Sequence, residues 1–483
     1  MQLITYPDSL GGDLRALDRV LQTHFLGLFE GGIHILPPFP SSGDRGFAPV
    51  TYLDIAPEFG RWEDIRRLGQ WRPVLLDLMV NHLSAGSVYF QDFLENGRKS
   101  EFADLFLSVD KIWPGGDIPR DEMEAIFLRR REPFSDFTLK GTGEVVRLWT
   151  TFGKTSPSEQ IDIDVRSAIA RRLLTEFMRK FAENGVSIVR LDAVGFVTKK
   201  RRTSWFFVEP DIYHFLEWIS GVADSLGLDV LPEVHADPTT TIKLAERGYW
   251  IYDFILPYMV LEALLRGSAT KLKEYLKTRP HRQFTMLDCH DGIPVKPDLN
   301  GLYRSEDVRK VVSICLERGA NLSRVYSPRH RDPDGFDVHQ IRGTFYSLLG
   351  SNDEAYLAAR AIQMFTPGVP QVYYVGLLAG ENDPAAAVAA GDGREINRHN
   401  YSMDEVERNL QRPVVQRLVK LIRFRNEHRA FDGEFRVLDS DDAALKLSWD
   451  NGRSSCQLTV DFKKAEAVIR SADDGGNPGE DPL

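Results

Sequence analysis

The chain has 483 residues, of which 42% are hydrophobic and 27% charged, and its formal net charge is −10 at pH 7. This acidic balance without a basic stripe argues against nucleic acid as a partner, and no apolar run approaches the roughly 20 residues of a membrane span. The N-terminus lacks a basic region and a leader-like apolar core, and the three cysteines have no CxxC spacing. We therefore expect a reduced, cytoplasmic protein without a zinc site.

Eight short apolar segments recur along the chain, mostly separated by amphipathic stretches. The expected strands are 2–6, 32–36, 74–80, 187–194, 228–234, 251–256, 284–289 and 369–375. Amphipathic patterns at 13–26, 166–184, 211–226 and 354–365 predict helices between them. Eight strands in alternation with helices are typical of an α/β protein of the (β/α)8 TIM-barrel type.

The spacing of these strands is uneven in two places, which predicts inserted subdomains, because structureless loops of such length are uncommon. After residue 430 short alternating segments predict a small antiparallel β domain, and the acidic, Gly- and Pro-rich tail from Ser471 is expected to be disordered. The expected units are a barrel of 1–82, 163–291 and 353–429, insertions at 83–162 and 292–352, and a C-terminal β domain with its tail at 430–483.

The segment 185–195 carries an arginine and a carboxylate on one face of an otherwise apolar strand. Arg190 and Asp192 are two residues apart, so their side chains point to the same side. A satisfied buried ion pair is the structural reading of this pattern. The functional reading is a carboxylate that the arginine keeps ionised at a strand end, as covalent glycosyl transfer needs.

Three further expected strands end on polar residues. They contribute His82 after the third strand, Glu233 after the fifth, and His290 with Asp291 after the seventh. A single such residue is more often a structural hydrogen-bonding group. Several acidic groups converging on one barrel mouth would destabilise the fold through repulsion, so their convergence favours a functional site.

These four segments, in their order and spacing, resemble the four signature regions of the α-amylase clan of glycoside hydrolases. The resemblance implies that Asp192 is the nucleophile, Glu233 the general acid/base and Asp291 the stabiliser of the transition state. It also implies that Asp291 and His290 hold the 2- and 3-hydroxyls of the sugar, and that His82 binds the 6-hydroxyl.

Four further segments resemble the sucrose phosphorylase subfamily of this clan. They are Gln2-Leu-Ile-Thr-Tyr6, His34-Ile-Leu-Pro37, Thr366-Pro-Gly-Val-Pro-Gln-Val-Tyr-Tyr-Val-Gly376 and Gly393-Arg-Glu-Ile-Asn-Arg-His399. The resemblance implies transfer of a glucosyl group to phosphate rather than to water. It places Asp44 and Arg394 as a clamp on the 4-hydroxyl of the glucose, with Phe47 and Arg190 in the same glucose site. A surface arginine is the plainer reading of Arg394.

Two loops of that subfamily line the acceptor site, and here they depart from the sucrose phosphorylase pattern. Arg129 stands where those enzymes have a proline and His339 where they have a tyrosine, while Gln340 is retained. Phe196 replaces a further tyrosine, and Lys140 could add another charge. The added basic side chains indicate an anionic acceptor, because arginine pairs bidentately with phosphate or carboxylate. A solvated charge run at 129–131 is the plainer reading.

Together these departures resemble the sucrose 6F-phosphate phosphorylase branch. The resemblance implies a retaining phosphorylase that converts sucrose 6F-phosphate and inorganic phosphate to α-glucose 1-phosphate and fructose 6-phosphate by double displacement. Glucosylglycerate phosphorylase and sucrose phosphorylase are the alternatives, and a hydrolase or a catalytically silent sugar-binding protein on the same barrel would be other classes. We expect no cofactor, no metal and no calcium requirement, and a monomer or homodimer whose partners are a sugar phosphate and phosphate.

Overall fold

The computed structural model describes residues 1–472 and 479–482, and its centre is a sheet of eight parallel strands. The strands follow the spatial order β10-β11-β15-β1-β2-β3-β8-β9, and β9 contacts β10, so the sheet is a nearly closed barrel. They are β1 (Gln2–Thr5), β2 (Ile33–Ile35), β3 (Val74–Met79), β8 (Val186–Asp192), β9 (Asp229–Pro232), β10 (Ile251–Asp253), β11 (Gln283–Thr285) and β15 (Val369–Tyr373). All eight expected strands and the barrel are thus confirmed.

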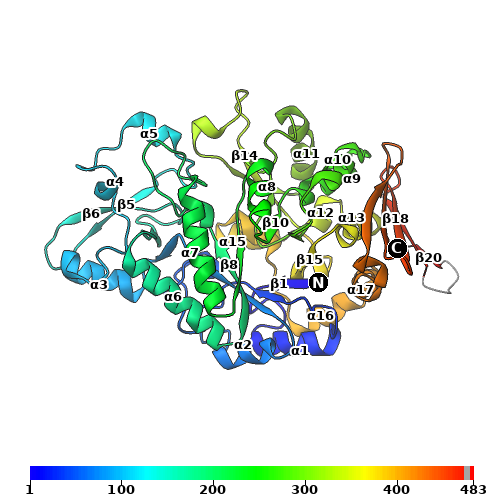
Figure 1. Cartoon of the computed structure of the whole chain (residues 1–483), viewed down its shortest axis with the longest axis horizontal. Coiled ribbons are helices and arrows are strands. Elements are labelled where there is room, and N and C mark those ends of the chain that lie inside the picture. The colour runs from blue at the N-terminus through cyan, green and yellow to red at the C-terminus, as the bar shows by residue number, and fades with distance from the viewer. Residues whose placement is uncertain (473–478, 483) are drawn as a thin grey trace.

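Helices between consecutive strands cover the outside of the barrel (Figure 1). In α1 (Leu14–His24) the side chain of Asp13 accepts the Ala16 backbone N–H, which starts the helix where the sequence predicts it. In α6 (Ala168–Glu183) apolar residues recur every three or four positions, which buries one helix face. Further helices are α2 (Trp62–Gly69), α7 (Asp211–Ser225), α8 (Pro238–Glu246), α9 (Leu256–Arg266), α10 (Thr270–Thr278), α13 (Asp353–Phe365) and α17 (Pro413–Glu427). Within the described part of the chain, no helix has the length and apolar composition needed to cross a membrane.

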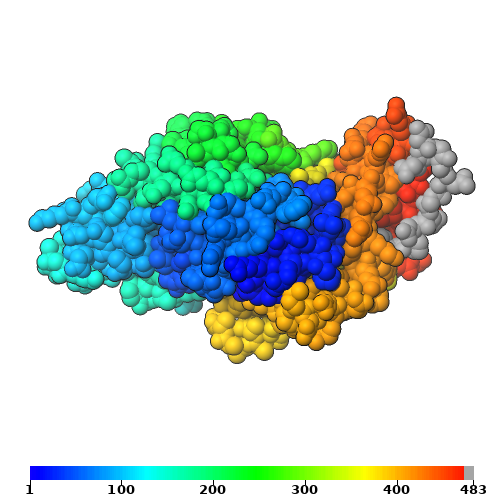
Figure 2. Space-filling view, turned by 90° about the horizontal axis from the view of Figure 1, so that it is seen from below, coloured from blue at the N-terminus to red at the C-terminus, as the bar shows by residue number. Residues whose placement is uncertain are grey.

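The long segment between β3 and α6 folds into its own small assembly of helices and hairpins. It contains β4 (His82–Ser84), α3 (Val88–Asn96), α4 (Val109–Ile112), α5 (Arg120–Ala125), β5 (Phe134–Thr138), β6 (Val145–Trp149) and β7 (Gln160–Asp162). Trp113 and Trp149 of this segment pack against Trp205, which follows β8, in a separate apolar cluster. The assembly lies at one end of the molecule, opposite the C-terminal sheet (Figures 1 and 2).

The segment between β11 and α13 carries a three-stranded antiparallel sheet. Its spatial order is β12 (Ile293–Pro294), β14 (Val338–Arg342) and β13 (Asn321–Arg324). Helix α11 (Ser305–Glu317) lies between β12 and β13 in the chain. The sheet follows β11 directly, so it lies at the end of the barrel where the strands terminate. The exact domain boundaries of both inserted segments stay predictions.

A five-stranded antiparallel sheet closes the chain, as predicted. Its strands are β16 (Glu434–Leu438), β17 (Ala444–Asp450), β18 (Ser455–Asp461), β19 (Glu466–Ala472) and β20 (Gly479–Pro482). The expectation of a disordered tail from Ser471 is wrong for the described residues, since residues 471–472 complete β19 and residues 479–482 pair with that strand. An edge strand offers unpaired backbone groups that a following segment can use. The rest of the expected tail, 473–478 and 483, lies outside the described residues.

A buried ion pair attaches the loop after β11 to α13. The Arg360 guanidinium is inaccessible to solvent and donates to Asp288 over 2.6 Å, to the Tyr356 hydroxyl over 2.9 Å and to the Gln363 side chain over 2.8 Å. Asp288 lies three residues before Asp291. Helix α13 therefore fixes the loop that carries His290 and Asp291.

This arrangement predicts a large stability difference between two arginine substitutions. Arg360→Met leaves Asp288 as an unpaired buried carboxylate, so we expect the free energy of unfolding to fall by about 3–5 kcal/mol. Arg417→Met removes a bidentate but exposed pair with Glu354, so we expect a loss of about 0–1 kcal/mol. Urea titrations followed by tryptophan fluorescence measure both, and equal losses would contradict a structural role for the buried pair.

Candidate active site

One guanidinium binds three carboxylates at the end of the barrel. Arg190 on β8 contacts Asp77 on β3, and it lies 2.8 Å from Asp192 and 3.1 Å from Glu233. Its side chain is 4% exposed, and Asp77 beneath it is completely buried and also bound by His34 at 2.8 Å. Because the strands are parallel neighbours, side chains at their carboxyl ends meet, and one arginine can join β3, β8 and the residue after β9.

The turn after Asp192 gives the second contact between the two expected catalytic carboxyls. Ala193 has a φ of 55°, which an L-residue adopts at a cost, and such strain is often found at functional sites. In this conformation its backbone N–H donates to Glu233 over 3.0 Å. Glu233 in turn donates its backbone N–H to the Leu191 carbonyl, so both carboxyls are fixed by the same pair of strands.

The proximity of Asp192 and Glu233 links their protonation. Burial raises the pKa of Asp192 well above its ordinary value, and the charge of Glu233 raises it further, although Arg190 opposes both. Burial acts in the same direction on Glu233, but Arg190 and His235 outweigh it and lower the pKa of Glu233 to about 2. Protonating either carboxyl removes the like charge beside the other, so the pair takes up its first proton far more readily than its second. The site can therefore hold one acid and one anion at the same time.

His235 connects Glu233 to a carboxylate of the second inserted segment. Its Nε2 lies 3.3 Å from Glu233, its Nδ1 lies 3.3 Å from Asp298, and its ring stacks on Phe254 at 3.9 Å between centroids. Burial would lower the pKa of this imidazole, but Asp298 and Glu233 raise it to about 10. At neutral pH His235 is therefore a cation beside the expected acid/base.

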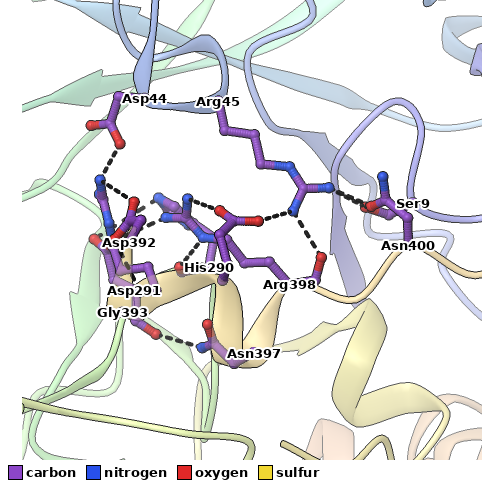
Figure 3. Close-up of polar contacts among 12 residues, drawn as sticks. Ser9, Asp44, Arg45, His290, Asp291, Asp392, Gly393, Asn397, Arg398 and Asn400 are labelled. Carbon is purple, nitrogen blue, oxygen red and sulfur yellow. Dashed lines mark hydrogen bonds and ion pairs between the residues drawn. The ribbon is translucent and has the colours of Figure 1, made fainter. Parts of the chain in front are cut away.

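Asp291 belongs to a second charged network at the same barrel mouth (Figure 3). Arg394 contacts Asp44 and lies 3.5 Å from Asp291 and 3.4 Å from Asp392. Burial opposes ionisation, but Arg394 and Arg398 are close enough that the pKa of Asp291 lies well below its usual range. Lys154 from the first inserted segment also binds Asp44, over 3.0 Å. Asp44 and Arg394 thus contact each other at the cavity, and their role as a clamp on the 4-hydroxyl of glucose stays a prediction.

Two histidines and one phenylalanine complete the wall next to these groups. His82 donates from Nε2 to the Phe47 carbonyl over 2.9 Å, and the Phe47 ring stacks on His290 with centroids 5.0 Å apart. Burial lowers the pKa of His82, and it lowers that of His290 to about 3, so both are neutral hydrogen-bonding groups. A wall of neutral imidazoles beside ionised carboxylates suits the hydroxyls of a sugar.

A cavity of about 600 Å³ brings these groups together. It is lined by Asp44, Phe47, His82, Asp192, Glu233, His290, Asp291 and Arg394, and by Arg129, His339 and Gln340 from the two acceptor loops. A larger cavity of about 760 Å³ lies beside it and shares the Phe127 and Phe206 walls, but none of the catalytic carboxylates lines it. The predicted glucose-site and acceptor-site residues therefore share one cavity, with two exceptions: Arg190, which contacts Asp192 and Glu233 but does not line the cavity itself, and Lys140.

The two acceptor loops meet through the side chains that distinguish this chain from the sucrose phosphorylase pattern. Arg129 contacts Nε2 of His339, while His339 donates from Nδ1 to the Lys296 carbonyl. This hydrogen-bond arrangement leaves Nε2 as the acceptor of the Arg129 proton. Burial and the charge of Arg129 lower the pKa of His339 well below its usual range. His339 is therefore a neutral group that orients Arg129, not a second positive charge.

Three residues of the predicted acceptor region lie elsewhere or have other roles. Lys140 is exposed and forms an ion pair with Glu95 at 3.2 Å, because it follows β5 on the outer side of the inserted segment. Arg130 donates to the backbone carbonyls of Phe152 and Thr155, so it braces the loop. Phe196 lies in an aromatic cluster at the cavity wall and contributes no polar group.

Several lining residues escaped the sequence analysis. His235 could have been found, because it lies two positions after Glu233 on the same extended segment. Lys154 and Arg342 reach the cavity from the two inserted segments, and no motif marked them. Their positions depend on how those segments fold back over the barrel.

The described residues offer one group that could hold a metal ion: Glu233, His235 and Asp291, whose ligand atoms lie within 4.8 Å of one another. A protonated His235 has no free lone pair for a metal, so a hydrogen-bonded charge network fits these residues better. Between the barrel and the first inserted segment, the Lys199 ammonium lies 2.8 Å from Asn81 and 2.9 Å from Asp162. Those oxygens, which a calcium ion would use, already bind a cation.

The His235–Asp298 contact predicts a shift in pH dependence. Asp298→Asn should lower the pKa of His235, remove its positive charge near neutral pH and so raise the pKa of Glu233. The basic limb of the kcat/KM profile, which reports the proton shared by Asp192 and Glu233, should move to higher pH by about 1–3 units. Asp332→Asn, which removes a carboxylate bound to Lys296 on the same loop, is the matched control. A kcat/KM profile of Asp298→Asn whose basic limb lies at the same pH as in the wild type would contradict this account.

Comparison with known proteins gives the family. No protein-family model matches the chain. Sucrose 6(F)-phosphate phosphorylase of Thermoanaerobacterium thermosaccharolyticum is 56% identical over 99% of this chain and 97% of that protein. Glucosylglycerol phosphorylase of Marinobacter adhaerens is 41% identical over 98% of this chain and 97% of that protein. A crystal structure of sucrose 6F-phosphate phosphorylase from Thermoanaerobacter thermosaccharolyticum matches with a TM-score of 0.98 and 55% identity, over 100% of this chain and 98% of that one. The chain therefore belongs to the sucrose phosphorylase subfamily of the α-amylase clan.

Proposed function

We propose that this chain is a retaining phosphorylase that converts sucrose 6F-phosphate and inorganic phosphate to α-glucose 1-phosphate and fructose 6-phosphate. One observation carries the choice of substrate: Arg129 lies in the cavity of the catalytic carboxyls, and no carboxylate of the described residues forms an ion pair with it. The relative at 56% identity and the solved structure at 55% identity are both sucrose 6F-phosphate phosphorylases, which supports the same reading.

In the first step the glucosyl half of the substrate occupies the pocket of Asp44, Asp291 and Arg394. Glu233 gives its proton to the bridging oxygen as the bond from that oxygen to the anomeric carbon breaks. An oxygen of Asp192 forms a new bond to the anomeric carbon, and fructose 6-phosphate leaves. With the proton on Glu233, the like charge that raises the pKa of Asp192 is absent, and the contact with Arg190 favours the ionised form of Asp192 against the effect of burial.

In the second step inorganic phosphate enters the space that the fructose 6-phosphate has left. A phosphate oxygen attacks the anomeric carbon, the ester bond to Asp192 breaks, and Glu233 takes up a proton from the attacking phosphate. Two inversions retain the anomeric configuration, so the product is α-glucose 1-phosphate. Asp291 and Arg394 bind the sugar in both steps, and neither residue exchanges a proton.

The anionic half of the acceptor is assigned to Arg129. Among the described residues, only the contact with neutral His339 uses a guanidinium N–H of Arg129, and its Nε is buried there without a hydrogen-bond partner. Burial lowers the pKa of Arg129, with Asp291 and Glu233 opposing, yet an arginine stays protonated. A phosphoryl group would compensate this charge. Glycerate also offers an anion, so glucosylglycerate is the second candidate substrate.

A side-by-side assay tests the proposal. Sucrose 6F-phosphate, sucrose, glucosylglycerate and glucosylglycerol are each supplied with and without phosphate, and α-glucose 1-phosphate and free glucose are measured. We expect the highest kcat/KM for sucrose 6F-phosphate and turnover that requires phosphate. A higher kcat/KM for glucosylglycerate would assign the chain to that branch, and glucose release without phosphate would make it a hydrolase.

Arg129→Gln gives a second, residue-level prediction. A charged hydrogen bond contributes about 1.5–3 kcal/mol, so the ratio of kcat/KM for sucrose 6F-phosphate over sucrose should fall roughly 10- to 150-fold. Sucrose places no anion at this point, so its own kcat/KM should change little. Arg131→Gln, an exposed neighbour at the cavity rim, is the matched control and should keep the ratio. A constant ratio in Arg129→Gln would contradict the assignment of the phosphate to Arg129.

A further inference from the structure

A second arginine reaches the same cavity from β14. Arg342 follows His339 and Gln340 on that strand, and all three residues line the cavity. Its side chain lies over two glycines: a Cβ at Gly292 would be 3.0 Å from its Cγ, and a Cβ at Gly393 would be 2.8 Å from its Nη1. Neither glycine has a φ in the left-handed region. The absence of their side chains leaves room for this arginine, and also for the Ile341 carbonyl next to Gly292 and the Asn321 side chain next to Gly393.

Arg342 has no ionic partner among the described residues. No carboxylate there lies within ion-pair distance of its guanidinium, and its Nε is buried without a hydrogen bond. Burial lowers its pKa, the charge of Arg394 lowers it further, and Asp392 and Asp291 only partly oppose this. Arg342 is half-buried, and a charge held partly out of water without a partner is costly unless a bound group compensates it.

The other two guanidiniums of this wall differ from Arg342 in this respect. Arg394 is compensated by Asp44, Asp291 and Asp392, and Arg130 donates to backbone carbonyls. Arg131 at the cavity rim is exposed to solvent, so Arg129 and Arg342 are the two less exposed arginines of the cavity for which the described residues provide no carboxylate or backbone carbonyl partner. The charge of Arg342 lowers the pKa of Arg129, and both charges lower the pKa of His339, which lies on the same cavity wall.

We propose that Arg342 is a second cationic ligand for a phosphoryl group in the acceptor half of the cavity. The proposal rests on the proposed phosphorylase function, in which two phosphoryl anions use this space in turn. They are the 6-phosphate of the leaving sugar and the inorganic phosphate that replaces it. Either anion has oxygens enough to engage two guanidiniums, and two such ligands would neutralise a phosphate dianion.

Steady-state kinetics of Arg342→Gln distinguish the two anions. If Arg342 binds inorganic phosphate, KM for phosphate should rise about tenfold or more, while the kcat/KM ratio of sucrose 6F-phosphate over sucrose stays constant. If it binds the 6-phosphate, that ratio should fall by a similar factor. Arg342→Lys keeps the charge on a shorter side chain and should recover part of whichever effect is seen.

Two controls keep the outcome interpretable. Arg324→Gln removes an exposed arginine of the neighbouring strand β13 that pairs with Asp337, and it should change neither quantity. Hydrolysis of α-glucosyl fluoride without phosphate involves no phosphoryl group and should be equal in wild type and Arg342→Gln.

Two results would overturn the inference: unchanged phosphate KM and substrate ratio in Arg342→Gln, or a loss of glucosyl fluoride hydrolysis that matches the loss of phosphorolysis. Failure of the proposed function would look different. In that case the wild-type enzyme itself would form no α-glucose 1-phosphate from any of the donors.

Discussion

The structure depends on one shared positive charge, the guanidinium of Arg190. It binds Asp77, Asp192 and Glu233 at once, and thereby joins three neighbouring parts of the barrel at their carboxyl ends. Three acidic groups so close together would repel one another strongly without it. The same contact that makes this crowding tolerable also places the two reacting carboxyls on one guanidinium. Stability of the barrel mouth and competence for double displacement therefore have a common origin.

The cavity divides into one half in which charges are paired and another half in which a positive charge has no carboxylate partner. Around Asp291 and Asp44, each carboxylate has a cationic partner, and neutral His82 and His290 complete a wall suited to hydroxyls. Toward the acceptor loops, Arg129 lacks a carboxylate partner within the described chain. A neutral sugar bound on one side and a phosphoryl group on the other would match this division. The proposed substrate carries both groups in the required order.

The sequence could predict the barrel and the convergence of Asp192, Glu233 and Asp291 on one cavity, because both follow from local pattern. Strand alternation sets where Asp192 and Glu233 end their strands, and parallel pairing brings those ends together. Contacts made by the inserted segments were less accessible. Lys140 was expected near the acceptor but pairs with Glu95 at the surface, and His339 was expected as a cation but is neutral. Both outcomes depend on contacts between residues far apart in the chain, which cannot be inferred from residue type and spacing alone.

The central claim is that Asp192, held by Arg190, forms the covalent bond to glucose. Trapping the intermediate with a fluorinated glucosyl fluoride, followed by proteolysis and mass spectrometry of the peptides, tests it most directly. The account predicts one glucosyl adduct per chain, on the peptide that contains Asp192, and its release when phosphate is added. An adduct on Glu233 or Asp291, or turnover to a β-configured product without any adduct, would contradict it.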